Sequence, residues 1–93
     1  MIDANSVPEK RLDARVRNYQ GNVIVGSSVA AVELNQVALR IWQLVDGRRT
    51  VAEIGAELAQ EFDVEAGQAT EDTRHLLGEL EEIRAINVAP ATA

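Results

Sequence analysis

The sequence contains no cysteine and only one histidine, and each shortage excludes a class of chemistry. Without cysteine there is no disulfide, thiol nucleophile or zinc–thiolate site. The histidine, His75, has no serine or second histidine near it in sequence with which to form a catalytic dyad. We therefore expect no metal and no cofactor, and a small enzyme is the weakest functional hypothesis.

Long apolar runs and basic residues are also scarce. No run approaches the roughly 18 apolar residues of a membrane span, and the N-terminus lacks a signal-peptide pattern. Fifteen acidic residues against nine Lys and Arg give a net charge of −6, whereas nucleic-acid binding requires a basic surface. We expect a cytoplasmic protein that binds neither membrane nor nucleic acid.

Aromatic residues make up only 3% of the 93 residues, so the core must consist mainly of Val, Leu, Ile and Ala. A chain of this length forms one modest domain. The polar, aperiodic segment 1–13 is expected to be a flexible N-terminal tail, residues 14–88 the folded domain, and residues 89–93 a disordered C-terminal tail.

Three short β-prone runs, separated by Gly-containing turns, come first in the folded domain. We expect strands at Ala14–Tyr19, Val23–Val25 and Val29–Leu34, with Val16 on the half-buried face of the first. Because both turns are short, the simplest topology is an antiparallel meander.

Two helices with strong start signals follow the strands. Asn35 is a favourable N-cap for a helix reaching about Val45. Thr50 and Glu53 have the spacing of a capping box at the start of the next helix. Gly55 lies inside that second helix, where it costs about 1 kcal/mol relative to Ala, so we expect a close helix–helix crossing there.

The periodicity predicts a third helix from about Gln68 to Arg84, and a short extended end at 86–88. Leu76 and Leu77 lie about 100° apart around this helix, so its apolar arc is wide. A wide arc could contact the core on one side and a second surface on the other.

A set of residues spread over the third strand and the helices forms one further pattern: Leu34-Asn35, Ala38, Ile41, the block from Asp46 to Ile54, Leu58, Phe62-Asp63-Val64, Asp72, Leu77 and Leu80. Together they resemble the PqqD-like family, the peptide chaperones known as RiPP recognition elements. The resemblance covers about residues 29–88, and two departures from the family pattern, at Thr73 and at 84–86, leave the identity of the peptide open.

The resemblance implies an α+β fold like a winged helix-turn-helix, a three-stranded antiparallel sheet followed by three helices. It also implies a non-catalytic module that binds the leader of a ribosomally made precursor peptide. The module would then present the peptide to a modifying enzyme, a radical SAM enzyme or a leader protease. Biosynthesis of pyrroloquinoline quinone (PQQ), lasso peptides and other modified peptides uses such modules.

The leader is expected to add a strand to the exposed edge of the third strand, beside the third helix. Candidate edge-strand residues are Val29, Ala30, Ala31, Val32, Glu33 and Leu34. Candidate residues on the third helix are Thr70, Arg74, Leu77 and Glu81.

Two alternatives stay open at this point. A winged-helix DNA-binding regulator or adaptor would share the architecture, although the second helix has three Glu and no Lys or Arg. An exposed edge strand can also pair with its own copy, so a homodimer is a further expectation to test.

Overall fold

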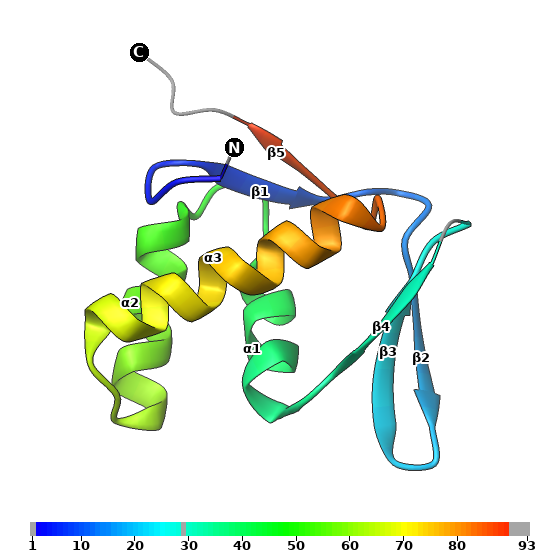
Figure 1. Ribbon diagram of the computed structural model, residues 1–93, viewed down its shortest axis with the longest axis horizontal. Coiled ribbons are helices and arrows are strands. Elements are labelled where there is room, and N and C mark those ends of the chain that lie inside the picture. The colour runs from blue at the N-terminus through cyan, green and yellow to red at the C-terminus, as the bar shows by residue number, and fades with distance from the viewer. Residues whose placement is uncertain (1, 29, 90–93) are drawn as a thin grey trace.

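The computed structural model describes residues 2–28 and 30–89, which form three helices, a three-stranded sheet and a two-stranded sheet (Figure 1). The fold is α+β, and the three-stranded antiparallel sheet precedes the helices as predicted. The elements in chain order are β1 (Val7–Lys10), β2 (Arg15–Tyr19), β3 (Asn22–Gly26), β4 (Ala31–Leu34), α1 (Gln36–Leu44), α2 (Val51–Phe62), α3 (Ala66–Glu82) and β5 (Ile86–Ala89).

The strands β2, β3 and β4 form the predicted antiparallel meander. Gln20 and Gly21 both have positive φ, 51° and 84°, as a two-residue hairpin loop requires. The face turned to the helices includes Val25 and Leu34, which are buried. Val16 lies on the face opposite Arg15 and Arg17, as predicted, and pairs with Val25, but it is 50% exposed, so the strand is less buried than the sequence predicted. The strand β2 extends beyond the area that the helices cover (Figure 1).

The N-terminal segment is not the flexible tail that the sequence predicted. Residues 7–10 form β1, which pairs antiparallel with β5, so that Val7 lies opposite Ala89 and Lys10 opposite Ile86. Ile2, Ser6 and Pro8 are buried. The predicted extended end at 86–88 is confirmed as part of β5, whereas residues 90–93 of the expected C-terminal tail lie outside the described residues.

Main-chain carbonyls of the N-terminal segment also complete the first turn of α2. The Val51 N–H donates to the Ser6 carbonyl at 3.0 Å, and the Ala52 N–H donates to the Ala4 carbonyl at 2.9 Å. These amides have no acceptor within the helix, so an outside partner removes a cost of roughly 1–3 kcal/mol for each buried donor. The first residues of the chain are therefore part of the folded unit.

The first two helices begin at the residues that the sequence predicted. Asn35 caps α1 by accepting from the Ala38 N–H at 2.8 Å. Thr50 and Glu53 form the predicted capping box of α2, with reciprocal bonds of 3.1 and 2.8 Å. The helix α3 begins at Ala66, two residues before the predicted start, because the Glu65 side chain caps it.

The core lies between the three helices and the inner face of the larger sheet. Trp42 is buried in α1, and the Lys10 ammonium lies 4.9 Å from the centroid of its ring. The buried stripe of α3 consists of Ala69, Thr73, Leu77 and Leu80.

No helix in the described part of the chain is long and apolar enough to cross a membrane. Within the same residues, no group of three His, Asp or Glu side chains could hold a metal ion.

Candidate functional site

The strand β4 lies at one end of the sheet order β2-β3-β4, so one of its sides has no strand partner among the described residues. At the β3–β4 turn the Ser27 N–H donates to the Ala30 carbonyl at 2.9 Å. In an antiparallel ladder every second residue of a strand bonds to the neighbouring strand. Counting in twos from Ala30, the main-chain groups of Val32 and Leu34 therefore bond to β3. The main-chain groups of Ala31 and Glu33 then point toward the open edge.

A groove of about 410 Å³ runs beside this edge, between β4, α1 and α3. Its apolar part consists of half-buried or buried side chains from all three elements, and polar side chains line the rest. The apolar residues are Val32, Val37, Ala38, Ile41 and Leu76, and the polar residues are Glu33, Asn35, Asp72, His75 and Glu79.

The wall that α3 contributes has helical spacing. Asp72, His75, Leu76 and Glu79 follow the i, i+3, i+4, i+7 pattern of a single helix face. The His75 Nε2 lies 3.3 Å from a Glu79 carboxylate oxygen, and Asp72 accepts from the Gln68 amide at 2.9 Å. These contacts hold the polar side chains in place along the groove while Leu76 remains available to a ligand.

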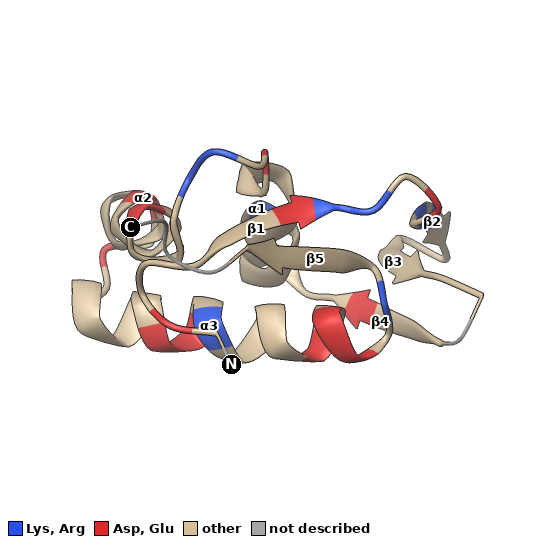
Figure 2. Cartoon of the chain, turned by 90° about the horizontal axis from the view of Figure 1, so that it is seen from above, with Lys and Arg blue, Asp and Glu red and all other residues tan. Residues whose placement is uncertain are grey.

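Carboxylates dominate the electrostatics of the groove. Glu33 contributes one from the strand side, and Asp72 and Glu79 contribute two from the helix side. Figure 2 shows acidic residues on α3 and at the end of β4. An extended peptide in this groove would meet an apolar surface bordered by negative charge, so apolar side chains accompanied by Lys or Arg would suit it best.

The predicted edge-strand residues lie where the sequence placed them, with Ala31–Leu34 in β4 and Ala30 just before it. Val29 lies outside the described residues. Leu34 is buried with its side chain in the core, so it can offer a peptide nothing beyond its main chain.

The predicted residues of the third helix do not line this groove. Leu77 is fully buried in the core, and Thr70 packs against Gly55 of α2. Arg74 and Glu81 border a different hollow, together with Ile2. Arg74 forms an ion pair with Glu71, which raises the pKa of the guanidinium and lowers that of the carboxyl.

The α3 residues that do line the groove lie one or two positions away from those predicted. Leu76 replaces Leu77, and His75, for which the sequence offers no catalytic partner, is exposed but lies on the groove wall. The 3.6-residue period was visible in the sequence. A helix with a wide apolar arc offers two registers for its buried stripe, however, and only the packing of α3 on α2 selects one.

A winged-helix domain with an open edge strand beside an apolar groove belongs to the class of modules that can bind an extended peptide as an added strand. The family model "Coenzyme PQQ synthesis protein D (PqqD)" matches residues 22–86. The chain belongs to the PqqD family.

Relatives from Xanthomonas are similar over nearly their whole length. The chain is 40% identical over 89 residues to the "PqqA binding protein" of Xanthomonas euvesicatoria pv. vesicatoria, covering 94% of this chain and 97% of the relative. It is 39% identical, with the same coverage, to the "PqqA binding protein" of Xanthomonas oryzae pv. oryzae.

Solved structures share the fold. The PqqD truncation of Methylobacterium extorquens PqqCD, described as a functional and stand-alone RiPP recognition element, has a TM-score of 0.78 at 24% identity, covering 94% of this chain and 95% of that one. TbiB1 in complex with the TbiA(beta) leader peptide has a TM-score of 0.71 at 18% identity, covering 85% and 94%. PqqD from Xanthomonas campestris has a TM-score of 0.60 at 28% identity, covering 94% and 99%.

Proposed function

We propose that this protein is a peptide-binding recognition element that takes up the leader of a PqqA-type precursor peptide. The leader would add a strand to β4 and lay alternate side chains into the groove between β4 and α3. The single observation that carries this proposal is the open β4 edge beside an apolar groove, in a chain of the PqqD family. The names of the relatives as PqqA binding proteins support the choice of peptide.

The proposed role is delivery of the peptide rather than chemistry on it. Main-chain pairing supplies affinity without regard to sequence, and side-chain contacts in the groove supply selectivity. A separate modifying enzyme, a radical SAM enzyme or a leader protease, would act on the presented core segment. PQQ biosynthesis is the pathway that the family name favours, and the cytoplasm is the compartment that we propose for it.

The charge of the helices disfavours the alternative of a DNA-binding regulator. In α2 there are three Glu and no basic residue, and α3 carries five acidic residues against Arg74 alone. A phosphate backbone would be repelled by both helices. Self-association through the β4 edge would compete with the leader for the same main-chain groups, so a homodimer through that edge would be displaced by peptide.

An NMR titration tests the proposal. The ¹⁵N-labelled full chain would be titrated with the synthetic leader of PqqA from Xanthomonas euvesicatoria, and with a scrambled leader of equal composition. We expect the authentic leader to shift the amides of Ala31–Leu34 and of the α3 wall, and the scrambled leader to bind more weakly. Equal binding of both peptides, or shifts elsewhere alone, would overturn it.

A further inference from the structure

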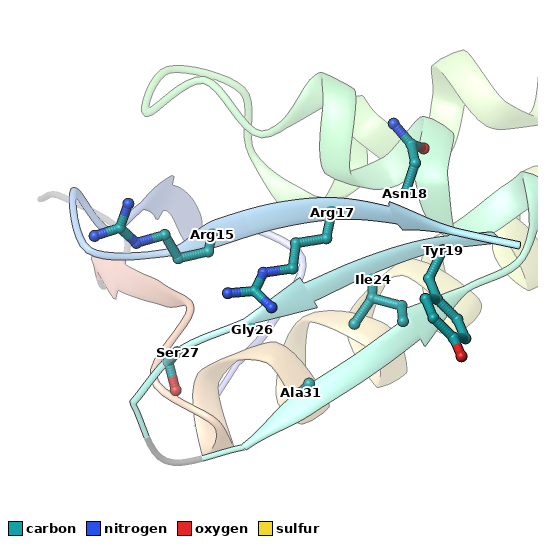
Figure 3. A pocket seen from close by; sticks show the side chains of 8 residues that line it. All are labelled: Arg15, Arg17, Asn18, Tyr19, Ile24, Gly26, Ser27 and Ala31. Atoms are coloured by element: carbon teal, nitrogen blue, oxygen red, sulfur yellow. The ribbon is translucent and has the colours of Figure 1, made fainter. Parts of the chain in front are cut away.

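The outer face of the β2–β3–β4 sheet, which points away from the helices, has a composition unlike the rest of this acidic chain. The pairing register places Arg15, Arg17 and Tyr19 of β2 on this face, next to Ile24 of β3 and Ala31 of β4. Figure 3 shows their side chains on the same side of the sheet, and the Asn18 side chain on the other. The side chains on the outer face border a hollow of about 570 Å³.

The two arginines of this face have no fixed partner within the described part of the chain. Neither makes an ion pair or a side-chain hydrogen bond, although Asp13 lies within the electrostatic reach of Arg15. The arginines Arg40, Arg49 and Arg74 all pair with a carboxylate instead. Arg15 and Arg17 are therefore available to an outside carboxylate, and the fork of a guanidinium suits that group.

Apolar groups accompany the charge. Tyr19 is 61% exposed, and the half-buried Ile24 lies between Arg17 on one side and Glu33 on the other. Arginine and tyrosine are among the residue types enriched at the centres of protein interfaces, and Ile24 adds apolar area between them. The acid Glu33 stands at the β4 edge of the face, so the positive charge is concentrated on the β2 side.

We propose that this outer face is a second binding site, which docks an acidic surface of a partner protein that carries an apolar anchor. The anchor would rest on Ile24 and Tyr19, while carboxylates of the partner pair with Arg15 and Arg17. The site lies on the opposite side of the sheet from the groove, so both can be occupied together. The inference goes beyond the proposed function and does not depend on it.

Charge and symmetry together select this occupant over a second copy of the chain and over a nucleic acid. A second copy docking face to face would bring four arginines together, and a copy docking its acidic α3 on this face would form an open chain rather than a closed dimer. A nucleic acid on this face would meet Glu33 at the β4 edge as well as the two arginines, and the net charge of −6 would oppose its approach.

The test uses the ¹⁵N-labelled full chain and two short synthetic peptides. One places Asp and Glu around a single Ile and Tyr, and its counterpart has Lys at every acidic position. We expect the acidic peptide to shift the amides of β2 and β3 at concentrations of about 1 mM or below, and to bind alongside the leader. The lysine peptide should leave these amides unmoved.

Two variants with the same change in charge distinguish an effect of this site on binding from an effect of the protein's net charge. Arg17→Glu should weaken the acidic peptide about tenfold, since it replaces an attraction with a repulsion. Arg48→Glu, at an exposed turn outside this face, should leave binding nearly unchanged. Both should keep a dispersed spectrum and bind the leader at the groove.

Several results would overturn the inference. They are the absence of shifts in β2 and β3 with the acidic peptide, equal shifts with the lysine peptide, stronger shifts with a DNA duplex, and shifts that depend only on the concentration of the protein itself. If the acidic peptide binds but the leader does not, the proposed function fails and the second site stands.

Discussion

Gly55 of α2 lies directly against Thr70 of α3, and this contact sets how closely the two helices cross. A Cβ at position 55 would lie 2.7 Å from the Thr70 Cα and 2.9 Å from its main-chain nitrogen, closer than real Cβ contacts come. The close crossing that the mid-helix glycine predicted is thereby confirmed. It fixes the rotation of α3, which turns Leu77 into the core and Leu76 toward the groove.

Substituting Gly55 with Ala should destabilise the protein, although alanine is the better helix former. The helices would have to move apart, at a cost of about 1–3 kcal/mol, which exceeds the helix-propensity gain of about 1 kcal/mol. Gly78→Ala is the matched control, because nothing lies within 4 Å of a Cβ built there. Chemical denaturation should show the first variant less stable than wild type and the second more stable; equal effects would refute the crossing geometry.

The N-terminal residues should contribute to stability through the first turn of α2. Deleting residues 1–6 removes the carbonyls of Ala4 and Ser6 and the buried Ile2 side chain. Because the deletion also opens the two amides to water, we expect a net loss of about 0.5–1.5 kcal/mol for each hydrogen bond, with a further loss from Ile2. Hydrogen exchange should show the Val51 and Ala52 amides protected in the full chain only. Leu12→Ala, at a fully exposed position, is the control and should change stability little.

The turn before α2 should lose stability in acid. The main-chain N–H groups of Arg49 and Arg48 donate to Asp46 at 2.9 Å and, with the charge of Arg49, hold the pKa of that carboxyl below its ordinary value of 3.8. A lowered pKa stabilises the fold above the unfolded value, and the benefit disappears as pH falls through the folded value. Thermal unfolding should therefore show Asp46→Ala less stable than wild type at neutral pH, and this difference in stability should narrow below about pH 4.

Asp46→Asn separates charge from hydrogen bonding in this turn. The amide oxygen can still accept from both N–H groups, so this variant should keep more stability than Asp46→Ala at neutral pH. A gap between Asp46→Ala and wild type that does not change with pH would contradict the assignment.

Two adjacent leucines on α3 should have opposite roles. Leu77→Ala should lower the free energy of unfolding by about 2–5 kcal/mol, because its side chain is fully buried. Leu76→Ala should cost less stability and weaken the PqqA leader about tenfold, because Leu76 lines the groove. Denaturation and fluorescence anisotropy with labelled leader measure both effects. A loss of affinity in a well-folded Leu77→Ala rather than in Leu76→Ala would place the groove on the other face of α3.

Local signals in the sequence were sufficient to predict the helix caps and the first hairpin. The caps at Asn35 and Thr50 act within three residues, so their partners can be identified from spacing alone. The hairpin at Gln20-Gly21 is equally local, because its φ angles demand residues that tolerate the left-handed region.

Features that depend on distant pairing could not be predicted in the same way. The strand β1 pairs with β5 at the other end of the chain, and its Pro8 and Glu9-Lys10 carry no alternating pattern. Pro8 reads as a loop residue in isolation, yet it is fully buried beneath other elements. The choice between Leu76 and Leu77 likewise depended on Gly55, which belongs to another helix.

The most direct test of the central account is the leader affinity of Glu33→Pro compared with Glu33→Thr. Both variants remove the carboxylate, but only proline removes the N–H that we assign to the open edge, while the ladder from Val32 and Leu34 to β3 remains. Calorimetric titration with the PqqA leader should show Glu33→Thr binding within a few-fold of wild type and Glu33→Pro losing at least about tenfold. Equal affinities in two folded variants would mean that the leader does not add a strand to β4.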